Sequence, residues 1–129
     1  MDALPEWPAG TVAVLSTAGP HAIPVSTATR AGDATIHLAL AHTRDSLARL
    51  RDDPRCALTI LAAGVAVTAY ASASVVDEGE RVSYVRLDVD EVVDHDQPTF
   101  ELTGGVSWHW TDDGAEAGDA EVRAALRRL

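Results

Sequence analysis

Residues 35–55 read TIHLALAHTRDSLARLRDDPR, and this stretch decides how the chain is arranged. The apolar periodicity of residues 35–41 predicts a β-strand. A helix of about two turns is expected directly after it, because the chain then offers a capping side chain, two leucines three residues apart and a proline that stops a helix. These features are Thr43 or Asp45, Leu47 with Leu50, and Pro54. No other internal segment has a helical pattern, so the rest of the fold must come from strands.

Short apolar runs separated by turn signals predict strands on both sides of this stretch. Upstream, glycine-containing turns separate two strands from residues 35–41, and the three look like a meander. Downstream, Gly64 separates the two strands of a hairpin, and a further strand carries Arg86, Asp88 and Asp90 on a solvent-exposed face. The predicted strands are 11–17, 22–29, 35–41, 56–62, 65–76 and 82–93.

The C-terminal part of the chain adds one more expected strand and a second helix. Phe100 and Leu102 lead into an alternating run that ends at Trp110, so Trp108 and Trp110 are expected on one face of a strand. Residues 114–118 are expected to link this strand to an amphipathic helix that runs to the end of the chain.

Six or seven strands with one short internal helix and a C-terminal helix predict a mostly β protein, built as a small antiparallel barrel. The length of 129 residues, with 47% hydrophobic and 23% charged residues, fits one domain. We therefore expect a single domain over residues 1–129, with the barrel at about residues 10–111 and the helix at about residues 119–129.

Composition also narrows the function classes. No stretch approaches the roughly 18 apolar residues of a membrane span, and the start MDALPEWPAG lacks the basic flank and apolar run of a secretory signal, so we expect a cytoplasmic protein. The single cysteine, Cys56, can form neither an internal disulfide nor a thiolate metal cage. His95-Asp96 and His109 with Asp112 match no recognised metal spacing, so no metal is expected.

The net charge argues against two classes of partner. Twenty acidic residues stand against ten basic ones, all arginine, which gives a formal charge of −10. Such a field repels phosphate backbones and anionic lipid, so neither nucleic acid nor a membrane is an expected partner.

The start of the internal helix is the best candidate site. Residues 42–55 hold four of the ten arginines, and Arg44 coincides with a helix N-terminus that carries the hydroxyls of Thr43 and Ser46. Free backbone N–H groups, a helix dipole, hydroxyls and a guanidinium are what a phosphate monoester needs. The alternative is structural: a residue that only caps the helix, Arg51 paired with a nearby acid, and Arg49 lying over the barrel.

The order of these features resembles the pyridoxamine 5'-phosphate oxidase-like family of FMN-binding split barrels. The likeness covers about residues 10–76. It comprises an early strand, a Pro-His turn, a strand beginning Ile23-Pro24-Val25-Ser26, a Gly-Asp turn, a third strand, and a Ser/Thr/Arg helix start that ends in Asp-Pro-Arg and Ala-Leu-Thr. The resemblance implies a split barrel, and a homodimer with two flavin sites at the subunit interface.

The same resemblance implies which residues contact the cofactor. The isoalloxazine would be bordered by Pro24, Val25, Ser26 and Thr27. The ribityl chain and phosphate would be approached by His42, Thr43, Arg44 and Ser46, with Arg49 in the same basic cluster. Trp108 and Trp110 are further candidates, to cover a flavin ring across the dimer; core or interface packing is their alternative role.

One departure from the family pattern concerns the phosphate. Family members that bind FMN well usually have Ser-x-Lys ahead of the helix. Registering on Leu50 and Pro54 places Arg44 at the serine position and Ser46 at the lysine position, so the basic and hydroxyl residues are exchanged.

Two classes of function therefore stay open. One is an FMN-dependent oxidoreductase acting on a small-molecule substrate, in which the cofactor supplies the redox chemistry and no protein general base is evident. The other is a non-catalytic split-barrel binding protein that has lost FMN. Related branches of the family bind a deazaflavin or haem, and the sequence names no substrate and no catalytic residue.

Overall fold

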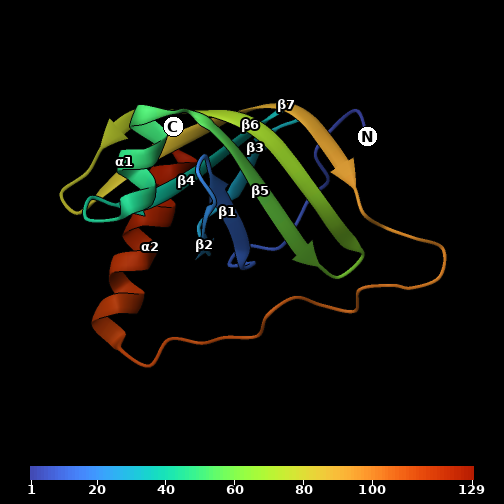
Figure 1. Cartoon of the computed structure of the whole chain (residues 1–129). Helices are drawn as coiled ribbons and strands as arrows, with labels where there is room; N and C mark the ends of the chain where they lie inside the picture. Colours follow the sequence, from blue (N-terminus) through green and yellow to red (C-terminus); the bar gives the residue numbers. More distant parts are fainter.

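The chain forms seven β-strands and two α-helices in a computed structural model that describes all residues, 1–129 (Figure 1). The strands are β1 (Ala13–Thr17), β2 (His21–Val25), β3 (Thr29–Gly32), β4 (Thr35–Ala41), β5 (Arg55–Ala62), β6 (Val65–Glu78) and β7 (Val82–Asp94). The helices are α1 (Asp45–Asp52) and α2 (Asp113–Arg127). Neither helix has the length and apolar character needed to cross a membrane.

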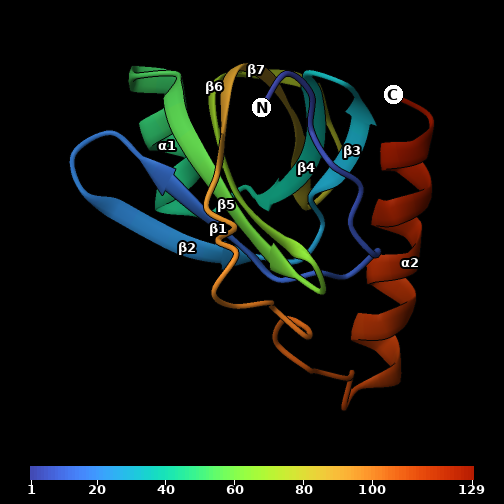
Figure 2. The same ribbon diagram turned by 90° about the vertical axis from the view of Figure 1, so that its right-hand side faces the viewer.

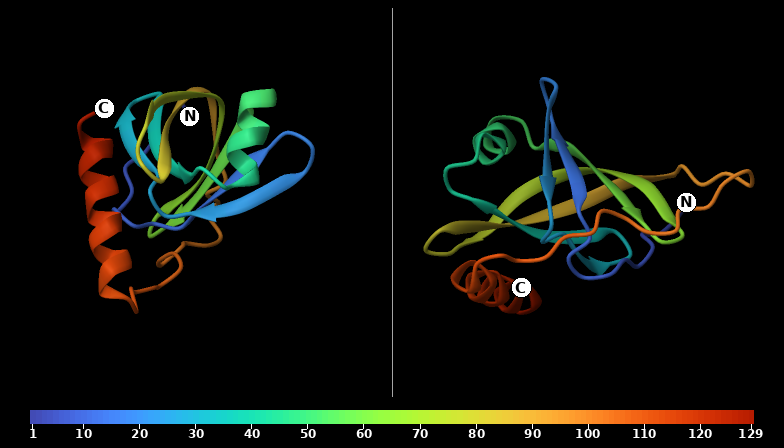
Figure 3. Two further views of the ribbon diagram at one scale, coloured as in Figure 1. Left: turned by 90° about the vertical axis from the view of Figure 1, so that its left-hand side faces the viewer. Right: turned by 90° about the horizontal axis from the view of Figure 1, so that it is seen from below.

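One antiparallel sheet contains all seven strands, in the order β2-β1-β5-β6-β7-β4-β3. The sheet curls on itself, and β2 and β3 are its two edges, so the barrel is split between them (Figure 2). Helices α1 and α2 lie on opposite sides of the barrel, and the β1–β2 hairpin projects from it (Figure 3). The predicted fold class, a mostly β split barrel with one internal and one C-terminal helix, is confirmed.

The core is formed by alternate residues of the strands. In β4, Ile36, Leu38 and Leu40 are buried, whereas the residues between them are only half-buried. The register places Leu38 opposite Val85 on β7, so the inner faces of neighbouring strands coincide. Two leucines of α1, Leu47 and Leu50, are buried as well and join this core.

The predicted three-stranded meander is wrong. We expected one strand over residues 22–29, but β2 ends at Val25 and β3 begins at Thr29 on the other edge of the sheet. The Thr27 hydroxyl donates to the Ala39 carbonyl oxygen at 3.3 Å and accepts from the Ala39 N–H at 3.0 Å. These contacts attach the chain to β4, so β3 pairs with β4 while β2 pairs with β1.

The strand predicted over Phe100–Trp110 is also wrong, because these residues form neither helix nor strand. Alternation alone does not make a strand, and this segment pairs with neither edge strand of the sheet, β2 or β3. It crosses the end of the β5–β6 hairpin, where Gly64 N–H donates to the Leu102 carbonyl oxygen at 2.9 Å. A Cβ on Gly105 would lie 2.5 Å from the Leu61 carbonyl oxygen, so only glycine fits that approach.

Helix α2 starts earlier than predicted. We expected the helix from about residue 119, with residues 114–118 as a link, but those residues are helical. The carboxylate of Asp112 accepts from the Ala115 N–H at 2.8 Å and caps the helix, and Asp113 and Glu116 are acids in its first turn. Gly114 and Gly118 made this segment look like a loop, although Asp112 is a typical N-cap residue.

The lone cysteine gives a prediction about pH. Cys56 is 8% exposed, and burial raises the pKa of its thiol to about 11. At pH 8 the reaction of the native thiol with a disulfide reagent should be on the order of a hundredfold slower than in urea-unfolded chain, because only the thiolate attacks. The native rate should rise toward pH 11.

Stability should change in the same pH range. The ordinary pKa of the thiol is 9.0, so between about pH 9 and pH 11 the unfolded chain loses this proton while the native chain keeps it. Raising the pH through this range therefore lowers the free energy of unfolding. Equal labelling rates for native and unfolded chain at pH 8 would contradict a buried, protonated Cys56.

Candidate functional site

A cavity of about 180 Å³ lies where β2 ends and the barrel is split. Nine residues line it: Ile23, Pro24, Val25, Ser26, Thr27, Ala39, Leu40, Ala41 and Arg44. Five of them belong to the predicted cofactor site, namely Pro24 to Thr27 and Arg44. The fold thus brings the end of β2 and the start of α1 to the same cavity.

The neighbouring strand explains why space remains at this point. Alternation along β4 directs Ala39 and Ala41 to the outer face of the sheet, opposite to the buried Leu40. Their methyl groups leave room where larger side chains would fill the gap. Sequence reasoning missed these two alanines, because a small residue in a strand carries no chemical signal of its own.

Arg44 supplies the positive charge of the cavity. It is the N-cap residue of α1, it is exposed, and its guanidinium forms no ion pair. By contrast, Arg51 pairs with Glu78 at 2.7 Å, which confirms the structural alternative for that arginine. The first N–H groups of any helix lack partners within the helix, so donors and charge coincide at Arg44.

Ser46 must be removed from the expected phosphate ligands. Its side chain has no exposed surface, and its hydroxyl lies 3.0 Å from Nε2 of His21. The serine therefore joins α1 to the β1–β2 hairpin and is not presented to a ligand. The positions of the apolar residues in the sequence did not predict that Ser46 would be buried.

The other predicted residues near the helix start are placed differently. His42 and Thr43 are exposed next to Arg44 but do not line the cavity. Neither Thr43 nor Asp45 caps α1, because no side chain makes the cap hydrogen bond. The guanidinium of Arg49 donates to the Gly19 carbonyl oxygen at 3.1 Å, so it fastens α1 to the β1–β2 turn.

The two tryptophans contact each other and do not line this cavity. Trp108 and Trp110 pack edge to face, with ring centroids 5.2 Å apart. The Trp108 indole N–H donates to the Gly10 carbonyl oxygen at 2.8 Å. The pair thus fastens the segment after β7 to the residues before β1, which agrees with the packing alternative.

Arg123 does not line the cavity but binds its wall at Ser26, and sequence reasoning missed it. It lies on α2, where its guanidinium donates to the Ser26 carbonyl oxygen at 2.8 Å and to the carboxylate of Asp119 at 2.7 Å. The Arg123 and Asp119 side chains are only 18% and 14% exposed. Helix α2 is therefore attached to the same short segment that forms the cavity wall.

One histidine lies near this face without belonging to the cavity. His37 is half-buried on β4, and burial together with the charge of Arg86 lowers its pKa below the ordinary 6.5. Its imidazole is therefore neutral at neutral pH. It adds no positive charge to that of Arg44.

The cavity can hold part of a flavin. Pockets that enclose a drug-sized ligand usually measure about 300–1,000 Å³, so 180 Å³ accommodates only a portion of such a molecule. Arg44 suits a phosphate, and the Pro24–Thr27 segment offers backbone groups and a small apolar wall. The residues fit one side of a flavin site that needs a further wall.

No protein-family model and no curated protein sequence matches the chain. Solved structures do match it. A Lactobacillus delbrueckii protein provisionally named as a pyridoxamine 5'-phosphate oxidase has a TM-score of 0.60 at 15% identity, over 72% of this chain and 95% of that chain. An FMN-binding protein from Syntrophomonas wolfei has a TM-score of 0.53 at 13% identity, over 70% and 79%.

A third similar structure covers more of the sequence. It is a Streptomyces globisporus C-1027 NADH:FAD oxidoreductase, with a TM-score of 0.55 at 15% identity over 84% of each chain. This chain has the split-barrel fold of the pyridoxamine 5'-phosphate oxidase-like proteins. At this level, that of the fold, the resemblance seen in the sequence is confirmed. In this fold the cavity lies between the end of β2 and β4, beside the split of the barrel.

The attachment of α2 to the split barrel can be tested through Arg123. In Arg123→Met, Asp119 loses its buried partner and the Ser26 carbonyl loses a donor, so releasing α2 should become about 1.5–3 kcal/mol easier. Amide hydrogen exchange in α2 should accelerate accordingly. Arg127→Met is the control, because Arg127 is exposed and forms no ion pair. Equal exchange in the two variants would argue against the attachment.

Proposed function

We propose that this split barrel is a flavin-dependent oxidoreductase that binds FMN in the cavity beside Arg44. The proposal rests on one observation: Pro24–Thr27 and Arg44, which forms no ion pair, line the same cavity. The names of two similar structures, an FMN-binding protein and an NADH:FAD oxidoreductase, support a flavin. A bound flavin supplies hydride and electron transfer, and the protein supplies binding, orientation and exclusion of water.

Different residues of the cavity would contact different parts of the cofactor. Arg44 would hold the phosphate, with the first N–H groups of α1 as additional donors. The Pro24–Thr27 segment would lie along the ring, and Ala39 and Ala41 leave room for it. No Asp, Glu or His lines the cavity, so these residues would orient the cofactor and would move no protons.

The phosphate contact can be tested by titrating FMN into the purified protein. Arg44→Ala should weaken FMN binding by about 10- to 100-fold, because a hydrogen bond between charged groups contributes about 1.5–3 kcal/mol. Arg49→Ala is the matched control, since Arg49 already donates to the Gly19 carbonyl and should leave FMN affinity within about twofold.

Ser46→Ala separates stability from binding in the same experiment. It should lower the free energy of unfolding by about 1 kcal/mol through loss of the His21 contact, with FMN affinity unchanged. Equal losses of affinity in Arg44→Ala and Arg49→Ala would indicate that FMN binds to a diffuse basic patch and not to a localised site at Arg44. A protein that takes up no FMN would instead be a split-barrel binding protein that has lost the flavin.

We further propose that a second copy of the chain completes the site. The cavity is too small for a whole flavin, and Pro24 belongs both to it and to the outer face of the sheet formed by β2, β1, β5 and β6. Strand register places Pro24, Val14 and Thr59 in one row of this face. Val14 is 39% exposed and Tyr70, on the same face, is 46% exposed, so this face presents apolar side chains to solvent.

The dimer can be tested with a charge on this face. Tyr70→Glu should convert a dimer of about 27 kDa into the 13.6 kDa monomer and weaken FMN binding, because the added carboxylate would be buried without a partner. Phe100→Glu is the control, since Phe100 is 49% exposed and lies outside the sheet. Sedimentation velocity reads the mass. A wild-type monomer that binds FMN with full affinity would overturn the shared site.

A further inference from the structure

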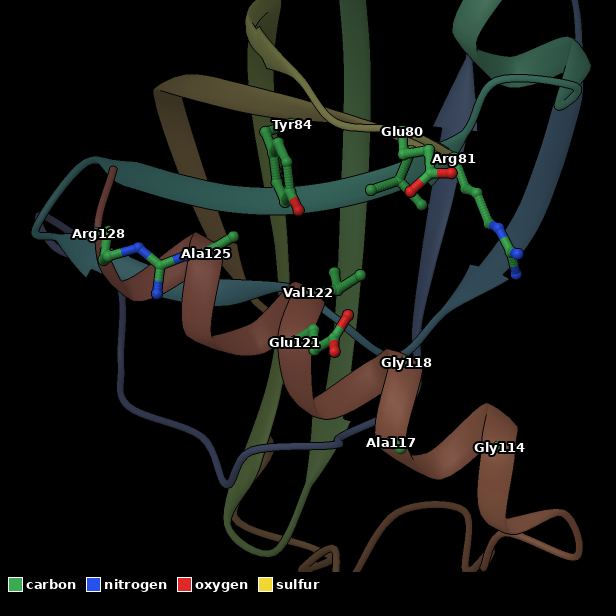
Figure 4. Close-up of a pocket in the computed structure, with 11 residues that line it drawn as sticks. Glu80, Arg81, Tyr84, Gly114, Ala117, Gly118, Glu121, Val122, Ala125 and Arg128 are labelled. Carbon is green, nitrogen blue, oxygen red and sulfur yellow. The ribbon is translucent and has the colours of Figure 1, made fainter.

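A second and larger cavity lies between α2 and the turn that joins β6 to β7 (Figure 4). It has a volume of about 480 Å³, within the range of ligand pockets. We call it the α2 groove and define it by Tyr84 and Val82 on β7, by Ala117, Val122 and Ala125 on α2, and by the charged residues at its rim. Figure 4 shows the Tyr84 hydroxyl pointing from the strand toward α2.

Tyr84 gives the groove a hydroxyl that is available to a ligand. Its side chain is buried, with the residue only 8% exposed, yet its hydroxyl has no hydrogen-bond partner in the protein. That hydroxyl is also absent from the fully enclosed polar atoms that lack a partner, so its exposed part faces the groove. Gly79 packs closely on the same ring, since a Cβ at this position would come within 3.2 Å of a ring carbon.

The helix side of the groove is shaped for a flat ligand. Ala117 and Ala125 line it together with Gly114 and Gly118, and these small residues let a ligand approach the helix backbone closely. The N-terminal part of α2, Asp113 to Gly118, is exposed, so the groove is open to entry at this end.

The charges favour an uncharged ligand. Two acids and two arginines stand at the rim, Glu80 and Glu121 against Arg81 and Arg128, and all four residues are exposed. Their charges cancel, and the whole chain carries −10, which disfavours an anion. The floor, by contrast, offers the apolar surface of Val82, Val122 and Ala125 with a single hydroxyl.

The α2 groove and the cavity beside Arg44 adjoin each other. Ala39 and Ala41 line the smaller cavity, and their direct partners across the β4–β7 pair are Tyr84 and Val82, which line the groove. Side chains of such pairs on one face lie about 5 Å apart. A molecule in the groove would therefore lie next to a flavin bound in the smaller cavity.

From these observations we infer that the α2 groove binds a flat, uncharged aromatic molecule with one hydroxyl or carbonyl oxygen, which hydrogen bonds to Tyr84. Its role as the substrate side of the flavin site rests on the proposed function. Binding to the groove itself does not require the flavin. The two claims can therefore fail separately.

The test is a titration of 2-naphthol, followed by its fluorescence, into the full-length protein without flavin. Tyr84→Phe keeps the ring and removes only the hydroxyl, so binding should weaken about 2- to 10-fold. Ala117→Leu fills the groove and should weaken binding by about tenfold or more. Ala120→Leu is the matched control, because Ala120 is exposed on the same helix outside the groove, and it should bind like the wild type.

The ligand class has its own control. 2-Naphthoate has the same rings with a carboxylate and should bind about tenfold or more weaker than 2-naphthol. Tighter binding of 2-naphthoate would overturn the uncharged class, and unchanged 2-naphthol binding in both Tyr84→Phe and Ala117→Leu would overturn the site.

Flavin titration distinguishes the two proposals. Binding of 2-naphthol without any uptake of FMN would refute the proposed function and leave the groove supported. Uptake of FMN that depends on Arg44, without binding of 2-naphthol, would refute the groove alone.

Discussion

The two hydrogen bonds between the Thr27 hydroxyl and the backbone of Ala39 determine where the barrel opens. They hold the chain against β4 directly after β2 has ended on the opposite edge of the sheet. A side chain here takes the place of a ladder partner, which leaves β2 and β3 as free edges.

Most polar side chains of α1 already have a partner within the protein. Arg51 binds Glu78, Arg49 binds the carbonyl oxygens of the β1–β2 turn, and Ser46 binds His21. Each of these contacts holds α1 on the barrel. Arg44 alone of this helix's arginines keeps its guanidinium free, and it is the one that lines the cavity. Structural and ligand-facing roles are therefore separated along a single short helix.

Helix α2 connects the cavity at the split with the groove behind it. Arg123 fastens the helix to the Ser26 carbonyl oxygen, and Leu126 is buried near its C-terminal end. The N-terminal half of α2 is exposed and small, so it stands away from β7 and leaves the groove over Tyr84. Helix α2 thus braces the segment that forms the cavity wall and also lines the open groove.

The sequence by itself determined the fold class, the internal helix, the β5–β6 hairpin and the presence of Arg44 at a helix start, because each rests on neighbouring residues and local periodicity. Tertiary structure alone decided that residues 22–29 are divided between two sheet edges, since the Thr27 contact joins residues 12 positions apart. It also turned Ser46 into the interior, left the segment around Trp108 without a strand partner, and brought Arg123 to Ser26 from 97 positions away. Such outcomes depend on which distant groups meet, and no local pattern contains that information.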